Sequence, residues 1–254
     1  MDTDLGPGTT LTWLGHATVL LELDGVRLLT DPVLRDRIGP LVRVAPSVDG
    51  SVLGPVDVVL LSHLHADHTD LPSLRRIAPP ASVVAPYPAA GWLTRRGLAG
   101  VREMRAGDEL DIGSVRVTAM PAIHDRRRRP LGPAADPIGY VVRGSRSAYF
   151  LGDTALDPGI ADLQDSIDVA MLPVWGWGRS LGPGHLDPSS AAKAAALIRP
   201  SVAIPIHWGT FALALPGRRP PDLERPAREF AALTNRDAPA IDVRVLAPGE
   251  RTAL

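Results

Sequence analysis

The chain has 254 residues, of which 45% are hydrophobic and 22% are charged, a balance typical of a globular protein with an apolar core. It contains no cysteine, so disulfides and thiolate metal sites are excluded. The formal net charge of -1 and the lack of a long apolar run argue against nucleic acid or a membrane as a partner. Residues 1–7 are acidic and polar, unlike a signal peptide, so we expect a cytoplasmic location.

The first part of the chain predicts an antiparallel meander. Asp24-Gly25 separates two apolar runs and is typical of a hairpin turn with positive φ. Residues 31–55 are rich in proline and glycine and predict a long irregular connection. A β-branched run at residues 57–62 predicts a buried strand. The strands expected before this connection are residues 11–15, 19–24 and 26–30.

Helices and strands alternate in the rest of the chain. The helix at residues 188–198 is the clearest, because Asp187 can cap it and Pro188 suits its first position. Further helices are expected at residues 71–77, 88–96 and about 222–233. Further strands are expected at residues 82–85, 115–119, 138–143, 148–151, 169–172, 202–206 and 243–246.

The order of these elements predicts the fold class. Two strand-rich halves are each followed by helices, and each sheet has two faces to bury. We therefore expect an α/β protein built as a four-layer αββα sandwich, with two mixed sheets inside and helices outside. No repeat or break in composition marks a boundary, so residues 1–254 are expected to form a single domain.

The densest chemistry lies directly after the predicted strand at residues 57–62. His63, His65, Asp67 and His68 fall within six residues. One histidine at a strand end is usually solvated or hydrogen-bonded, but three imidazoles and a carboxylate in one loop are hard to explain by packing. Imidazole and carboxylate are ligands for Zn²⁺, Mn²⁺ and Fe²⁺. The segment therefore predicts a metal site.

Three more polar residues follow apolar runs in the same way. They are His124, Asp153 and His207. Gly152 would allow close backbone approach and leave the Asp153 carboxylate at the rim of a sheet. Each residue alone is typical of a capped or hydrogen-bonded strand end. Together with the histidine-rich loop, they supply what a two-metal site requires.

These segments resemble the metallo-β-lactamase fold superfamily over nearly the whole chain. The resemblance lies in His63-Leu64-His65-Ala66-Asp67-His68, Gly152-Asp153-Thr154 and residues 206–211, IHWGTF. Residues 13–18, WLGHAT, and 29–33, LTDPV, are similar to the branch that contains N-acylphosphatidylethanolamine-hydrolysing phospholipase D and the ascorbate-6-phosphate lactonases. The resemblance implies an αββα sandwich with metals in a groove at one edge of the sheets.

The resemblance also implies a centre of two divalent cations. The first would be bound by His63, His65 and His124, and the second by Asp67, His68 and His207, with Asp153 bridging them. Asp31 matches a position that orients a ligand imidazole from outside the coordination sphere. This nitrogen-rich set favours Zn²⁺, although Mn²⁺ and Fe²⁺ also accept it.

Such a centre implies hydrolysis, because two cations lower the pKa of a shared water from 15.7 toward ~7. We expect the bridging hydroxide to attack a phosphodiester, or a lactone or other ester, of a small anionic substrate. Asp67 would bind the second metal and hold the nucleophilic water. His185 lies in a segment that resembles one lining the active site of the phospholipase D branch, where it would contact substrate; the alternative is a loop histidine. His16 is expected to give structural support.

Two further segments bear on the substrate. Arg126 to Arg129 follow His124, and we expect one of these arginines to bind an anionic group while the others are solvated. Trp175 and Trp177, each followed by glycine, predict an apolar lip to a pocket. This lip departs from the phospholipase D pattern and argues against a lipid substrate.

Three other readings remain beside the hydrolase. A metal-holding scaffold or binding module would keep a closed coordination shell, whereas a catalyst leaves an open position. A nuclease is less favoured because the chain is not basic. A diiron oxidoreductase is disfavoured, because such relatives have glutamate where His65 stands. Similarity to the lactonases is also compatible with a homo-oligomer.

Overall fold

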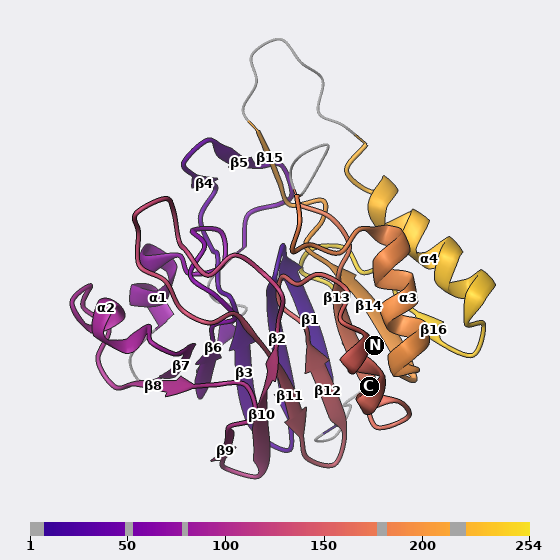
Figure 1. Cartoon of the computed structure of the whole chain (residues 1–254), viewed down its shortest axis with the longest axis horizontal. Coiled ribbons are helices and arrows are strands. Elements are labelled where there is room, and N and C mark those ends of the chain that lie inside the picture. Colours follow the sequence, from indigo (N-terminus) through magenta and orange to yellow (C-terminus); the bar gives the residue numbers. More distant parts are fainter. Residues whose placement is uncertain (1–7, 49–52, 78–80, 177–181, 214–221) are drawn as a thin grey trace.

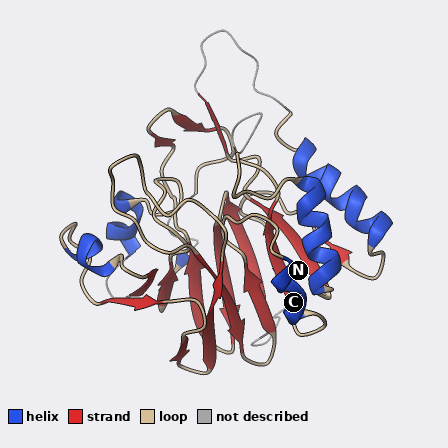
Figure 2. Cartoon of the chain, in the orientation of Figure 1, coloured by secondary structure: helices blue, strands red, loops and turns tan. Residues whose placement is uncertain are grey.

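Two mixed β-sheets packed face to face form the centre of the computed structural model, with helices on their outer sides (Figures 1 and 2). The structure describes residues 8–48, 53–77, 81–176, 182–213 and 222–254. In spatial order, the first sheet contains β17 (Arg251–Ala253), β1 (Thr10–Gly15), β2 (Thr18–Leu23), β3 (Val26–Thr30), β6 (Val58–Leu60), β7 (Ser82–Pro86) and β8 (Val101–Met104). The second contains β16 (Asp242–Val243), β14 (Val202–Ile206), β13 (Val169–Pro173), β12 (Ser147–Phe150), β11 (Ile138–Arg143), β10 (Val115–Pro121) and β9 (Glu109–Ile112).

The two sheets share one plan of strand directions. Neighbours from β1 to β3 are antiparallel, and those from β3 through β6 and β7 to β8 are parallel. Likewise, β9 to β12 pair antiparallel, and β12 through β13 and β14 to β16 pair parallel. As a result β1, β3 and β6 run in one direction, and so do β10, β12 and β14. Residues that follow these strands are therefore collected at one edge of each sheet.

Alternate residues of the strands enter different apolar layers. On β2, Val19 and Leu21 join the core between the sheets, whereas Leu20 joins a second cluster with Leu74 and Leu93. Leu74 belongs to α1 (Leu71–Ile77) and Leu93 to α2 (Ala90–Thr94), which cover the outer face of the first sheet. Strands buried on both faces read as continuous apolar runs, which explains why the sequence reveals them.

The helices α3 (Pro188–Ile198) and α4 (Arg225–Asp237) pack against each other and cover the second sheet. The start of α3 confirms the prediction. The Asp187 side chain accepts a hydrogen bond from the Ser190 backbone N–H at 2.7 Å, and the Ser190 hydroxyl accepts one from the Asp187 backbone N–H at 2.8 Å. This reciprocal pair is a capping box, closed by Pro188 at the first helical position.

Several short elements were not expected from the sequence. The 31–55 connection, predicted as irregular, contains β4 (Arg37–Ile38) and β5 (Leu41–Arg43), which form a small sheet with β15 (Phe211–Leu213). The edge strands β8, β9 and β17 and the 3-10 helix at Pro158–Leu163 also escaped prediction. Edge strands carry polar residues, so they lack the apolar run of a buried strand. In place of the strand expected at residues 243–246, β16 spans only Asp242–Val243. The helix α2 spans Ala90–Thr94, which is shorter than the predicted range 88–96.

Two other features complete the comparison with the expected elements. The Asp24-Gly25 hairpin turn is confirmed, with φ of +50° and +81° at the two residues. In the described part of the chain, none of the helices has the length and apolar character needed to cross a membrane.

The capping box predicts a measurable contribution to stability. We expect Asp187→Ala to lower the free energy of unfolding by about 1 kcal/mol and Asp187→Asn to lower it much less, because asparagine also caps helices. Hydrogen bonds from Ser190 lower the pKa of Asp187. The stability contributed by ionised Asp187 is therefore complete above its pKa in the unfolded chain, about 3.9. It is lost as pH falls through the lower pKa that Asp187 has in the folded protein. Urea unfolding at pH 7 and below pH 4 tests this; equal stability of the three proteins at pH 7 would contradict it.

Candidate metal centre

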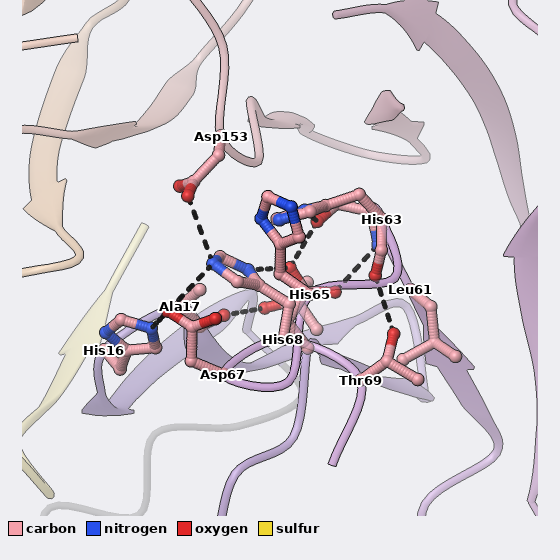
Figure 3. Close-up of polar contacts among 12 residues, drawn as sticks. His16, Ala17, Leu61, His63, His65, Asp67, His68, Thr69 and Asp153 are labelled. Carbon is pink, nitrogen blue, oxygen red and sulfur yellow. Dashed lines mark hydrogen bonds and ion pairs between the residues drawn. The ribbon is translucent and has the colours of Figure 1, made fainter. Parts of the chain in front are cut away.

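The predicted site residues meet at the carboxyl edge of the two sheets. Asp31 follows β3, and the loop that contains His63, His65, Asp67 and His68 follows β6. From the second sheet, the residues beyond the ends of β10, β12 and β14 are His124, Asp153 and His207. The close-up in Figure 3 shows Asp153 pointing at His68 from the opposite sheet. The structure therefore brings all the predicted ligands together.

The first group consists of His63, His65 and His124, whose ligand atoms lie within 4.8 Å of one another. His65 Nδ1 and His124 Nε2 are 3.0 Å apart. Behind them, His65 Nε2 donates to the Arg127 carbonyl at 2.9 Å and His124 Nδ1 donates to the Gly184 carbonyl at 2.7 Å. Because a neutral imidazole has one N–H, the two facing nitrogens both carry lone pairs.

His63 presents a lone pair in the same way. The Ser62 hydroxyl donates to Asp31 Oδ2 at 2.5 Å, so it accepts from His63 Nδ1, which lies 2.9 Å away. His63 Nε2 is buried and has no hydrogen-bond partner. Burial also lowers the pKa of His63 well below its usual value. An orphaned, unprotonated nitrogen that belongs to a group of imidazoles is suited to a cation.

The second group consists of His16, Asp67, His68 and His207. His68 Nε2 and His207 Nε2 are 3.1 Å apart, and His207 Nδ1 donates to the Trp175 carbonyl. His68 Nδ1 lies 2.7 Å from Asp31 Oδ2, which places Asp31 behind an imidazole as expected. Asp67 Oδ2 lies 3.9 Å from His68 Nε2. A proton or a metal cation must separate the two facing nitrogens.

Asp153 lies between the groups. Its Oδ2 is 3.2 Å from His68 Nε2, and its Oδ1 is 3.3 Å from His207 Nε2. Burial alone would raise the pKa of Asp153, but the neighbouring imidazoles outweigh burial and hold it well below its usual value. Burial would lower the pKa of His68, yet the charges of Asp153 and Asp31 raise it well above its usual value. The two carboxylates therefore favour positive charge at His68.

His185, for which the sequence offered a substrate contact or a loop histidine, lies next to these groups. Its Nε2 is 3.6 Å from Asp153 Oδ2, and its ring meets that of His124 edge-on with centroids 4.6 Å apart. The His185 side chain is 22% exposed, whereas that of Asp153 is 4% exposed. His185 is thus a partly accessible imidazole beside a buried carboxylate. With it, all seven histidines of the chain belong to one cluster.

His16 enters the cluster more deeply than the expectation of structural support implied. It follows β1, is 2% exposed and places Nε2 3.2 Å from Asp67 Oδ2 (Figure 3). Burial, together with nearby His207, lowers the pKa of His16 to about 3. The signal in the sequence was the position of His16 at a strand end, the same signal that marked His124 and His207.

Backbone conformation turns several of these side chains into the centre. His16, Asp31 and His207 are non-glycine residues with φ of +53°, +34° and +64°. The left-handed region is uncommon for such residues and costs free energy unless the surroundings enforce it. Gly152, with φ of +63°, lies so close to Ser62 that an added Cβ would be 2.7 Å from the Ser62 Cβ. The close approach predicted for Gly152 is confirmed.

The arginine run contacts the centre mainly from behind. Arg128 donates to the carbonyls of Leu64 and Thr69 at 2.6 and 2.9 Å, which fixes both ends of the histidine-rich loop. Arg126 pairs with Asp136 at 2.7 Å. The side chains of Arg127 and Arg129 are exposed. The expectation that one arginine meets an anion while the others are merely solvated is therefore wrong for Arg128, which is structural.

The tryptophans divide between the core and the centre. Trp208 stacks on Trp13 with centroids 4.8 Å apart and is buried. Trp92 lies near two arginines, and the guanidinium carbons of Arg96 and Arg128 are 5.5 and 5.1 Å from a ring centroid. Trp175 is half-buried and holds His207 through its carbonyl. Trp177, the other half of the predicted lip, is outside the described residues.

Residues 26–208 match the family described as the beta-lactamase superfamily domain, and the match covers well over half of the chain. The chain belongs to the metallo-β-lactamase superfamily. It is 34% identical over 249 residues to a protein named UPF0173 metal-dependent hydrolase from Methanopyrus kandleri, covering 94% of this chain and 97% of the relative. This relationship places the chain among the UPF0173 proteins.

Solved structures show the same fold at lower identity. A metallo hydrolase from Ignicoccus hospitalis has a TM-score of 0.74 and 24% identity, over 97% of this chain and 98% of its own. A diiron β-hydroxylase from Streptomyces venezuelae has a TM-score of 0.72 and 18% identity, over 98% of this chain and 55% of its own. Proteins named as a hydrolase and as an oxidative enzyme thus share this fold, so the reaction must be inferred from the residues of the site.

The contact between Gly152 and Ser62 predicts a cost for any side chain at residue 152. Gly25 has φ of +81° and nothing within 4 Å of an added Cβ, so Gly25→Ala measures the cost of backbone conformation alone, about 1–2 kcal/mol. We expect Gly152→Ala to lose at least ~1 kcal/mol more, because its methyl group must displace Ser62. Urea unfolding of both variants measures the difference, and equal losses would show that the contact relaxes freely.

Proposed function

We propose that this protein is a metal-dependent hydrolase that binds two divalent cations at the carboxyl edge of its sheets. The observation that carries the proposal is the 3.0 Å separation between His65 Nδ1 and His124 Nε2. When both rings are neutral, the two facing nitrogens carry lone pairs, and burial lowers the pKa of His124 to about 4, so its Nε2 is not protonated at neutral pH. Two lone pairs that face each other repel, whereas a metal cation between them would be coordinated by both nitrogens.

The residues divide into two ligand sets joined by one carboxylate. His63, His65 and His124 would hold the first cation, Asp67, His68 and His207 the second, and Asp153 would bridge them. Asp31 would orient His68, as its 2.7 Å contact with Nδ1 supports. Nitrogen and carboxylate oxygen in this proportion favour Zn²⁺. The imidazole of His65 argues against a diiron oxygenase, for which glutamate is expected there.

Two divalent cations in this arrangement would supply a hydroxide at neutral pH and polarise the bond to be broken. Asp67 would orient the attacking oxygen, since its carboxylate belongs to the group around the second cation. His185 would contact substrate, because it is partly exposed beside Asp153. Burial lowers the pKa of His185, which keeps its ring neutral at pH 7 and able to donate one hydrogen bond to a developing oxyanion.

The proposed substrate is a small anionic molecule with a phosphodiester, lactone or other ester bond. Similarity of residues 13–18 and 29–33 to the phospholipase D and lactonase branch supports these bond types. Arg127 supports the anionic character, since its backbone carbonyl accepts a hydrogen bond from His65 and its side chain is exposed. The near-neutral net charge argues against a nuclease.

Metal analysis and a substrate screen test the proposal together. We expect the purified protein to contain about two equivalents of divalent metal and to hydrolyse bis(p-nitrophenyl) phosphate or a member of a lactone panel. His65→Ala should retain about one equivalent and lose turnover, whereas Asp162→Ala, at an exposed position, should change neither. Wild-type protein with two metals and no turnover on any ester would favour the scaffold, and protein without metal would refute the centre.

The exposed arginine makes a separate prediction about charge. We expect Arg127→Ala to lower kcat/KM for the anionic bis(p-nitrophenyl) phosphate by roughly 10-fold, as for a lost hydrogen bond to a charged group. For the neutral substrate p-nitrophenyl acetate, Arg127→Ala should keep the kcat/KM of the wild type. Arg126→Ala is the matched control, because that guanidinium is already paired with Asp136. Equal losses with both substrates would contradict a role in anion recognition.

A further inference from the structure

We propose that His16 is a positioning residue that holds the Asp67 carboxylate by a hydrogen bond donated from its Nε2. The distance from His16 Nε2 to Asp67 Oδ2 is 3.2 Å, and the His16 side chain is 3% exposed. This inference rests on the proposed function, since Asp67 is there a ligand of the second cation. According to this inference, His16, in the turn between β1 and β2, sets the orientation of the Asp67 carboxylate.

The backbone of His16 is fixed on both sides. Its N–H donates to the Thr210 hydroxyl at 2.6 Å, and its carbonyl accepts from the His207 N–H at 2.8 Å and from Trp13 Nε1 at 2.9 Å. The corner is also packed closely, because a Cβ added to Gly15 would lie 2.9 Å from the Thr210 side chain. His16 therefore joins β1 to the segment that carries His207.

The ring of His16 is held as firmly as its backbone. It lies against the His207 ring with centroids 3.9 Å apart, and it meets Phe211 edge-on at 5.4 Å. Packing on two sides restricts rotation about χ1 and χ2, so Nε2 stays directed at the carboxylate. The backbone of His16 is also in the left-handed region. Such a strained conformation persists only where the surrounding contacts enforce it.

The arrangement favours donation to Asp67 over coordination by His16. Asp67, His68, His207 and the bridging Asp153 already offer four protein ligands to the second cation, the usual number for zinc. A neutral imidazole with its single N–H on Nε2 has no lone pair on that atom. Hydrogen bonding from behind restricts the ways in which a ligating carboxylate can approach a metal.

Two amide variants separate positioning from a structural role. His16→Gln can place an amide N–H where Nε2 lies, whereas His16→Asn places its amide closer to the backbone and cannot reach Asp67. Asparagine tolerates a positive φ better than glutamine does, so a purely structural role would make His16→Asn the milder change. Positioning of Asp67 predicts the opposite order, with His16→Gln the milder change.

The measurement is the affinity of each cation, obtained by chelator competition with Zn²⁺ and checked by the visible spectrum of the Co²⁺-substituted protein. We expect His16→Asn to weaken the second cation by 10- to 100-fold, roughly the range for lost support of a ligand, and to leave the first unchanged. His16→Gln should recover most of the loss. In an Asp67→Ala background, His16→Asn should cause no further loss.

Each result has a definite meaning. Wild-type affinity in His16→Asn, or a loss in His16→Gln as large as that in His16→Asn, overturns the positioning role. A further loss in the Asp67→Ala background also overturns it, because His16 would then act independently of Asp67. A wild-type protein that binds no divalent cation refutes the proposed function and this inference with it. Two cations bound equally by all variants refute only this inference.

Discussion

A buried imidazole can present a lone pair to a shared centre only if its other nitrogen has a hydrogen-bond acceptor behind it. The acceptors here are carbonyls or side-chain oxygens of Asp31, Ser62, Arg127, Trp175 and Gly184. They come from loops of both sheets, so the tautomers of the cluster depend on the whole fold. Without these acceptors, the histidines could turn N–H groups inward, and fewer lone pairs would face the shared centre.

Strand direction explains why the centre forms at this edge. Each sheet passes from antiparallel to parallel pairing at its middle, so the carboxyl ends of alternate strands collect at one edge. There the chain turns sharply, and His16, Asp31 and His207 accept left-handed backbone conformations. Such conformations cost about 1–3 kcal/mol each, and the apolar layers on both sides of the sheets provide the stability that offsets them.

Much of this arrangement could be predicted from local sequence. The histidine-rich loop, and His124, Asp153 and His207 at the ends of apolar runs, are visible because a polar residue after a buried strand stands out. His16 gives the same signal, but its contact with Asp67 requires β1 and β6 to lie in one sheet, which local sequence does not reveal. Arg128 was missed because a guanidinium that binds loop carbonyls has the same sequence context as a solvated one. The polar edge strands β8 and β9 acquire their structure only by pairing.

The pairing of β17 with β1 places Ala253 opposite Thr10, at a sequence separation that spans nearly the whole chain. Contacts between residues so far apart in the sequence form slowly, because the entropy of closing the loop is lost before the contacts compensate it. During synthesis, the first sheet therefore remains incomplete while the ribosome still holds residues 251–253. The contact that completes the first sheet beside β1 therefore forms late, after β6 and β14 have been synthesised.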